Sequence, residues 1–188
     1  MGRRMMLKAI TVFCGSARDC PDVYRRMARE AGSVIARQGR TLVYGSGDWG
    51  LMGDVARGAL DAGGRVIGVN VRQFDGTPST VTCSEYYVEE DFASRKAALV
   101  ARGDACVALP GGTGTLDELT ELYVQAQLGH WNKPFGILNF RGYYDGLLMQ
   151  LRRAHQDGFL SGPDLSRLLV AEDMETLLHL LDAAQGAS

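Results

Sequence analysis

The chain has 188 residues, of which 46% are hydrophobic, and a formal net charge of −2. This length and composition suit one hydrophobic core, so we expect an N-terminal tail over residues 1–6 and a single domain over residues 7–184. The arginines are scattered in pairs and form no basic stripe, and no apolar stretch is long enough to cross a bilayer. These features argue against nucleic acid and membrane partners and favour a cytoplasmic protein.

The four cysteines and three histidines show none of the spacings that are typical of a zinc site. Cys14 and Cys106 lie inside apolar runs, so we expect them to be buried, reduced thiols. The sequence therefore predicts neither a disulfide framework nor a bound metal.

Short apolar runs alternate with longer amphipathic segments along the chain. The expected strands are residues 9–13, 41–44, 65–69, 85–88, 104–109, 135–138 and 168–170. The expected helices are residues 21–38, 51–62, 92–102, 116–128, 143–157 and 174–184. This alternation predicts an α/β fold: a single-domain, doubly wound parallel sheet with helices on both faces. In such a sheet, ligands bind at the carboxyl ends of the strands.

A glycine-rich turn follows the second expected strand. Gly45, Gly47 and Gly50 match the pattern G-x-G-x-x-G. A dinucleotide site would place this pattern after the first strand and an acidic residue at the end of the next one, where this chain has Asn70. We therefore expect the turn to border another ligand, while tight packing of a helix on the sheet is the alternative explanation.

Arg95 and Lys96 lie near the start of the helix expected over residues 92–102. Cations are favoured at the opposite end of a helix, so the position is unusual. The pair is either an ordinary solvated pair or, if the helix begins beside the ligand, a source of positive charge for a phosphate or a leaving base.

The segment Pro110–Glu118 joins an apolar strand to an amphipathic helix. Three glycines and two threonines leave backbone amides free at the start of that helix, where the helix dipole also favours an anion. The sequence lacks the Gly-Lys-Ser/Thr ending of a P-loop. Phosphate is the expected anion, and Glu118 is either a catalytic carboxylate or the last residue of a capping box that begins at Thr115.

Five blocks in this order are similar to the LOG family of cytokinin riboside 5′-monophosphate phosphoribohydrolases, whose members have been labelled lysine decarboxylases. The most specific block is Pro110–Thr115 with Glu118, which resembles the family signature PGGxGTxxE. The other blocks are Val12–Ser16, Gly50–Gly53, Arg95-Lys96, and the segments Gln127–Gly129, Lys133-Pro134, Leu138-Asn139 and Gly142–Asp145.

The resemblance implies a Rossmann-like homodimer that hydrolyses the N-glycosidic bond of a nucleoside 5′-monophosphate and needs no cofactor. It implies that Arg95 and Glu118 are the catalytic pair. Glu121 lies three residues beyond Glu118 on the same face of the expected helix, so we expect it to help to position Glu118. The residues expected to bind the substrate are Gly15, Ser16, Gly45, Gly47, Gly50, Met52, Lys96, Pro110, Gly111, Gly112, Thr113, Gly114, Thr115 and Glu121.

Several positions depart from the family pattern. Ser46 interrupts the usual three glycines of the second loop, Phe92-Ala93 replaces a Met-His pair, and Asn70–Arg72 replaces Ile-Pro. Trp49 adds an aromatic ring that would either stack on a base or pack in the core, and Trp131 would either fill the core or form a dimer contact or pocket lid. The substrate is therefore either a cytokinin or AMP-like nucleotide or another purine or pyrimidine monophosphate.

Two alternatives come from other classes of protein. A molybdenum cofactor carrier would use the same glycine loop for the phosphate of its pterin. A decarboxylase would need pyridoxal phosphate on a lysine, and the only lysines are Lys8, Lys96 and Lys133, none in an evident cofactor site.

Overall fold

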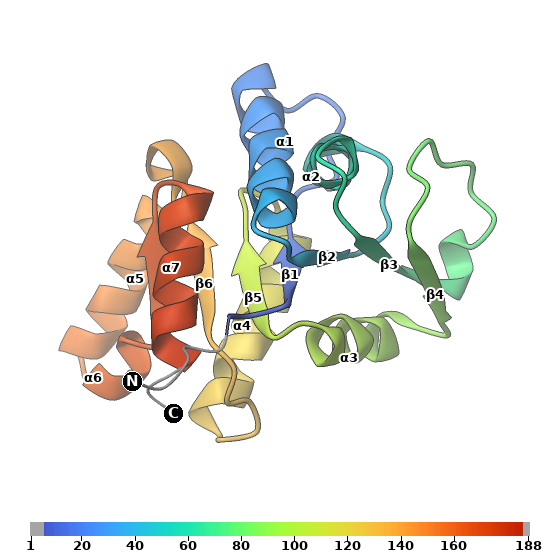
Figure 1. Cartoon of the computed structure of the whole chain (residues 1–188). Helices are drawn as coiled ribbons and strands as arrows, with labels where there is room; N and C mark the ends of the chain where they lie inside the picture. Colours follow the sequence, from blue (N-terminus) through green and yellow to red (C-terminus); the bar gives the residue numbers. More distant parts are fainter. Residues whose placement is uncertain (1–5, 186–188) are drawn as a thin grey trace.

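The computed structural model describes residues 6–185, so residues 1–5 of the expected N-terminal tail lie outside the described part. Seven parallel strands form one sheet in the order β4-β3-β2-β1-β5-β6-β7 (Figure 1). The strands are β1 (Ala9–Phe13), β2 (Thr41–Tyr44), β3 (Val66–Val71), β4 (Glu85–Glu89), β5 (Ala105–Ala108), β6 (Phe135–Leu138) and β7 (Leu168–Ala171). The predicted parallel α/β fold is confirmed.

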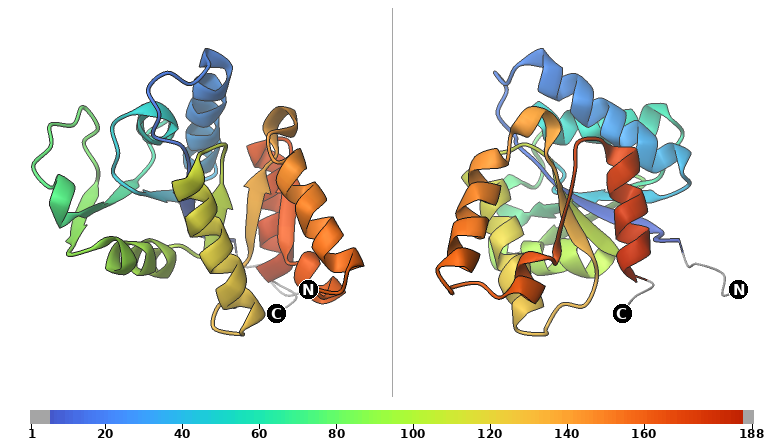
Figure 2. Two further views of the ribbon diagram at one scale, coloured as in Figure 1. Left: turned by 180° about the vertical axis from the view of Figure 1, so that it is seen from behind. Right: turned by 90° about the vertical axis from the view of Figure 1, so that its left-hand side faces the viewer.

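Helices cover both faces of this sheet (Figures 1 and 2). They are α1 (Asp22–Arg37), α2 (Gly50–Asp61), α3 (Phe92–Arg102), α4 (Thr113–Gln127), α5 (Asp145–Gln156), α6 (Gly162–Leu165) and α7 (Met174–Gln185). Side chains of α1, α2 and α7 form one hydrophobic cluster, and those of α3, α4 and α5 form another on the opposite face. Within residues 6–185, no helix combines the length and the apolar composition needed to cross a bilayer.

Two helices differ from the sequence-based expectation. Helix α4 begins at Thr113, three residues before the expected start, because Thr113 and Gly114 complete its first turn. Helix α6 was not expected, since its four residues are too few to show a helical period; its start is capped by Ser161, whose side chain accepts from the amide of Asp164.

The order of the strands creates an opening at the carboxyl ends of two central strands, β1 and β5. Strand β1 pairs with β2 on one side and with β5 on the other. The chain that leaves β1 leads to α1 on one face, whereas the chain that leaves β5 leads to α4 on the opposite face. Because these two loops diverge, a crevice forms outside the carboxyl ends of β1 and β5.

Trp131 and two cysteines are core residues. The Trp131 side chain is 8% exposed and belongs to the cluster under α4 and α5, so the core interpretation is confirmed and little of the ring is left for a partner. Cys14 and Cys106 are buried and free, as expected. Burial raises the pKa of the Cys106 thiol to about 12, which keeps it protonated and unreactive.

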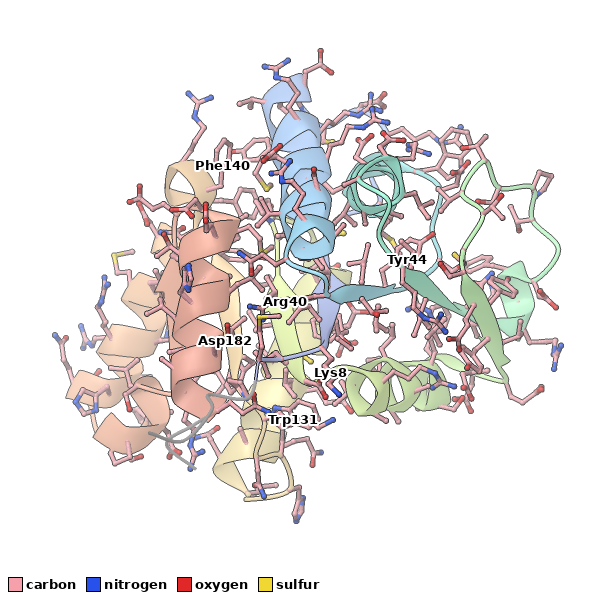
Figure 3. All side chains as sticks on the ribbon, in the orientation of Figure 1. Lys8, Arg40, Tyr44, Trp131, Phe140 and Asp182 are labelled. Atoms are coloured by element: carbon pink, nitrogen blue, oxygen red, sulfur yellow. The ribbon has the colours of Figure 1, made fainter. Side chains whose placement is uncertain are left out.

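A buried ion pair fastens the last helix to the sheet. The Arg40 guanidinium, just before β2, donates to both carboxylate oxygens of Asp182 on α7, at 2.9 and 2.7 Å (Figure 3). Asp182 also accepts from the amide of Leu7. The two side chains are 2% and 15% exposed. Although burial acts in the opposite direction, the hydrogen bonds from Arg40 and Leu7 hold the pKa of Asp182 below its ordinary value.

We predict that D182A lowers the free energy of unfolding by about 3–5 kcal/mol, because it leaves the buried Arg40 cation without a counter-ion. Chemical denaturation at pH 7 measures the loss. The control is D61A, which breaks the exposed pair between Arg29 and Asp61 and should cost less than about 1 kcal/mol. Equal losses in the two variants would contradict the role of the buried pair.

Candidate active site

One cleft of about 1290 Å³ lies outside the carboxyl ends of the strands. It is bordered by the loops that follow β1, β2 and β5, by the start of α3, and by the irregular segment of residues 74–83. The cleft thus occupies the position that the strand order opens. Segments far apart in the sequence meet there, as the positions of the glycine-rich turns at the strand ends predict.

The N-terminus of α4 faces this cleft. Its N-cap is Gly112, which provides no side chain to accept hydrogen bonds from the amides of the first turn. A Cβ atom at Gly112 or Gly114 would meet no other atom within 4 Å, so the backbone here is open to a ligand. Free amides and the positive end of the helix dipole make this turn an anion-binding site.

The capping-box interpretation of Thr115 and Glu118 is wrong. Thr115 lies inside the first turn of α4 and is buried, and the N-cap position belongs to Gly112. Because helix α4 starts earlier than expected, Glu118 lies in its second turn, and its side chain lines the cleft. The alternative, a carboxylate within the ligand site, is the one that the geometry supports.

Close backbone contact joins the loops after β1 and β5. The amide of Gly15 donates to the carbonyl of Pro110 at 3.1 Å. A Cβ on Gly111 would lie 2.1 Å from Thr115 Oγ1, so only glycine fits there. Pro110 and Gly111 therefore shape the loop without lining the cleft, whereas Gly15 and Ser16 line it together with residues 112–115.

Two hydrogen bonds hold the Arg95 side chain in the wall of the cleft. Asp91 and Ser94 form the capping box that starts α3, so Arg95 lies in the first turn of this helix. Its Nε donates to the carbonyl of Val69 at 3.0 Å and its Nη2 to the carbonyl of Gly45 at 2.8 Å. These two bonds direct the Arg95 side chain into the cleft and away from solvent. They explain why a cation lies at the end of a helix where the dipole does not favour it.

Glu118 faces Arg95 across the cleft. Glu118 Oε1 lies 3.7 Å from Arg95 Nη1, and the two side chains are 16% and 11% exposed. Burial raises the pKa of Glu118 to about 7, and the nearby Arg95 cation only partly offsets this rise. Burial also lowers the pKa of Arg95, although a guanidinium remains protonated at neutral pH. The site therefore holds a carboxyl group that can change its charge near neutrality beside a permanent cation.

Lys96 and Glu121 form an ion pair at the edge of this site. Lys96 Nζ lies 3.0 Å from Asp117 Oδ2 and also contacts Glu121. Hydrogen bonds to these two carboxylates raise the pKa of Lys96. Lys96 and Asp117 line the cleft, but Glu121 does not. Glu121 is thus paired with Lys96, and the structure shows no contact through which it would position Glu118.

The loop after β2 contributes Gly45 and Gly47 to the cleft wall, and the first turn of α2 contributes Met52. Gly50 lies outside the lining and has a φ of 59°, and a Cβ there would lie 2.5 Å from the carbonyl of Ala17, so this glycine serves backbone packing. Trp49 is 48% exposed and lies at the cleft, with the Arg18 guanidinium 3.6 Å from its ring centroid. Of the two alternatives for Trp49, this exposure excludes packing in the core.

Residues 74–83 form a wall of the cleft. The sequence places the segment after Val69 at the carboxyl ends of the strands but identifies no binding residue in it. Phe74 and Phe92 both line the cleft and meet edge to face, with ring centroids 6.2 Å apart. Asp48 fastens this segment by accepting hydrogen bonds from the amide and the hydroxyl of Thr80. The proline and glycine content of the segment indicated an irregular loop, but no sequence pattern shows which strand ends such a loop covers.

A parallel α/β sheet with an anion-binding helix N-terminus and a buried carboxyl–guanidinium pair at the carboxyl ends of its strands defines a doubly wound α/β protein with a ligand site at that edge. The comparisons give the family. A family described as "Possible lysine decarboxylase" matches residues 52–181. The cytokinin riboside 5′-monophosphate phosphoribohydrolase of Rhodococcoides fascians is 40% identical over 170 residues, covering 89% of this chain and 86% of the relative. The corresponding enzyme LOG5 of Arabidopsis thaliana is 37% identical, with coverages of 94% and 78%. The chain belongs to this phosphoribohydrolase family.

Solved structures confirm the fold. The molybdenum cofactor binding protein of Rippkaea orientalis superimposes with a TM-score of 0.71 at 22% identity, covering 95% of this chain and 98% of the other. The molybdenum cofactor carrier protein of Chlamydomonas reinhardtii gives a TM-score of 0.69 with the same identity and coverages. At this level of identity the likeness establishes the fold alone.

The residues of the cleft do not suit the decarboxylase chemistry that the family description names. Pyridoxal phosphate needs a lysine that is free to form a Schiff base. Lys96 is the one lysine that lines the described cleft, and it is held by Asp117 and Glu121. Lys133 donates to the carbonyls of Ala101 and Gly103, away from the cleft. No step of such a reaction is assigned to these residues.

The buried position of Glu118 predicts a pH-dependent change in stability. The folded protein keeps the proton of Glu118 at pH values where the unfolded chain has lost it, so the free energy of unfolding falls as pH rises from about 4.5 to about 7. We compare E118Q with wild type by the difference in their free energies of unfolding. We expect this difference to shift in favour of E118Q by about 2–3 kcal/mol between pH 4.5 and pH 8.

Urea denaturation of both proteins at the two pH values measures this difference. D117N is the matched control, since Asp117 lies in the same helix turn but is mostly exposed. The difference in the free energy of unfolding between D117N and wild type should change by less than about 1 kcal/mol between the two pH values. A constant difference for E118Q would show that Glu118 has an ordinary pKa in the folded protein.

Proposed function

We propose that this protein hydrolyses the N-glycosidic bond of a nucleoside 5′-monophosphate, releasing the free base and ribose 5-phosphate. The observation that carries the proposal is the placement of Glu118 and Arg95, 3.7 Å apart, in one cleft with the open N-terminus of α4. Membership of the phosphoribohydrolase family supports the same reaction.

The 5′-phosphate is proposed to bind at the start of α4. The amides of residues 113–115 and the loop at Gly15 and Ser16 would surround it, because both segments line the same part of the cleft. Lys96 adds positive charge nearby, although its two carboxylate partners largely neutralise it. Selection of a monophosphate over a nucleoside would then depend mainly on backbone amides and the helix dipole.

Glu118 is proposed to act as a carboxylate. As the bond between C1′ and the base nitrogen breaks, positive charge grows on the ribose ring, and a nearby carboxylate stabilises that charge. The electron pair of the broken bond goes to the base. Water adds to C1′, and the proton that it loses is transferred to the base, so the products are the neutral base and ribose 5-phosphate. Glu118 can also orient this water by accepting a hydrogen bond from it.

Arg95 is proposed to stabilise the departing base. A guanidinium is a poor proton donor because it stays protonated at neutral pH. Its fixed position, given by hydrogen bonds to Val69 and Gly45, favours electrostatic stabilisation of the negative charge that grows on the base.

The base is proposed to lie toward β3 and β4. Phe74, Phe92 and Tyr86 line this end and offer aromatic surfaces to a base. The proposed substrates are a cytokinin riboside monophosphate or AMP-like nucleotide and, as the alternative, another purine or pyrimidine monophosphate.

We also propose that the protein is a cytoplasmic homodimer. The support for a dimer is the family resemblance together with an apolar strip on α4, where Val124 and Leu128 lie one helical turn apart and are both exposed. The support for the cytoplasm is the set of free cysteines, Cys14, Cys20, Cys83 and Cys106.

Chromatographic product analysis tests the proposed reaction. The protein is incubated with AMP, CMP, GMP, UMP, IMP and isopentenyladenosine monophosphate, and with the matching nucleosides as controls. Release of base from a monophosphate but not from its nucleoside is the expected result. Failure to release any base, together with a bound pterin detected by mass spectrometry, would instead support a molybdenum cofactor carrier.

E118Q is expected to fold and to lose about 10²- to 10³-fold in kcat, because it removes the carboxylate that stabilises the charged ring. D117N tests whether any loss of negative charge in this helix turn has the same effect, and we expect it to keep most of its activity. Near-wild-type turnover by E118Q would exclude Glu118 from the chemistry.

The pH dependence of kcat/KM should show an acid limb near the pKa of Glu118, which is about 7. Because the reaction uses the ionised carboxylate, kcat/KM should rise about tenfold per pH unit below this value and level off above it. A phosphate monoester loses its second proton near pH 6. A single limb near pH 6, unchanged in E118Q, would therefore report the substrate and contradict the role of Glu118.

A further inference from the structure

Ser46 adopts a backbone conformation that is unusual for a residue with a side chain. Its φ is 58°, and Arg141 is the one other non-glycine residue with positive φ within residues 6–185. Such a conformation costs roughly 1–3 kcal/mol and persists only where the surroundings hold it. Glycine would adopt it without this cost, so the serine side chain at this position calls for a physical explanation.

The surroundings of Ser46 hold its hydroxyl against the sheet. The Ser46 hydroxyl and the Cys83 thiol both lie against Gly68, and the Cys83 thiol lies 3.7 Å from the Tyr44 hydroxyl. Gly68 on β3 makes room for this cluster, since a Cβ there would lie 3.0 Å from Ser46 Oγ and 2.7 Å from Cys83 Sγ. The serine therefore anchors the loop after β2 to the ends of β2 and β3.

Gly45, which precedes Ser46 in the chain, holds Arg95 in place. The carbonyl of Gly45 accepts the 2.8 Å hydrogen bond from Arg95 Nη2. The approach is so close that a Cβ on Gly45 would lie 1.9 Å from the same nitrogen. Any rotation of the peptide between Gly45 and Ser46 would turn this carbonyl away from Arg95, whose Nη1 faces Glu118.

We propose that Ser46 is a positioning residue: its hydroxyl anchor and left-handed backbone fix the Gly45 carbonyl, which in turn fixes Arg95 opposite Glu118. Ser46 acts through Gly45 and need not touch the substrate. The proposal rests on the proposed function, in which Arg95 and Glu118 act as a pair. It explains why a serine lies in a position that favours glycine.

The test compares S46G and S46A with wild type and uses R141G as the matched control. Arg141 has almost the same φ but lies outside the cleft. We expect kcat of S46G and S46A to fall about 10- to 100-fold with little change in KM, since a small misplacement of a catalytic group has effects of this size. R141G should keep the kcat of wild type.

A second readout does not depend on the substrate. Titration of Glu118 is followed by NMR in protein carrying isotope-labelled glutamate, with E118Q used to assign the signal. If Ser46 holds Arg95 in place, Glu118 in S46G should titrate about 0.5 or more higher on the pH scale, because the cation that favours the carboxylate is less well placed. R141G should titrate as wild type does.

The outcomes are distinguishable. Reduced kcat with a shifted titration in S46G supports the positioning role. Unchanged kcat and unchanged titration in a folded S46G, with only its Tm altered, would overturn it and leave Ser46 a structural residue. If wild type releases no base from any nucleotide, the proposed function fails, and the titration alone decides whether Ser46 positions Arg95.

Discussion

The burial of Glu118 beside Arg95 is the interaction on which the site depends. In water, a carboxylate and a guanidinium 3.7 Å apart would interact weakly, and the carboxyl group would be fully ionised at neutral pH. In the cleft, burial brings the pKa of Glu118 to about 7 and strengthens its interaction with the permanent cation. The rest of the fold has to hold these two charged groups where solvent does not screen them.

The sheet topology supplies that arrangement. Arg95 comes from α3 and Glu118 from α4, and both helices pack on the same face of the sheet. Helix α3 follows β4 and helix α4 follows β5, so each helix starts at the carboxyl edge of the parallel sheet. The loops after β1 and β5 lead to opposite faces, and the anion-binding turn of α4 opens into the crevice between them.

Two side chains of the site approach the backbone so closely that only glycine fits there. Gly45 admits the Arg95 guanidinium and Gly111 admits the Thr115 hydroxyl, and at either position a Cβ would come within 2.1 Å of another side chain. Strained or desolvated groups at a site reduce stability, so they persist only where the surrounding structure is well fixed. The two hydrophobic clusters provide that stability.

The sequence by itself determined the fold class, the strand positions and the glycine-rich turns, because hydrophobic periodicity and turn composition are local properties. It also pointed to Arg95, Glu118 and the anion-binding turn. Only the tertiary structure decided that Glu118 is not a cap, that Trp49 faces the cleft, and that Glu121 pairs with Lys96. It also revealed the contact between Phe74 and Phe92 in the cleft and the left-handed backbone of Ser46, next to the Gly45 carbonyl that holds Arg95. These features depend on which distant segments meet and on how much water they exclude, and no local pattern of residues encodes either.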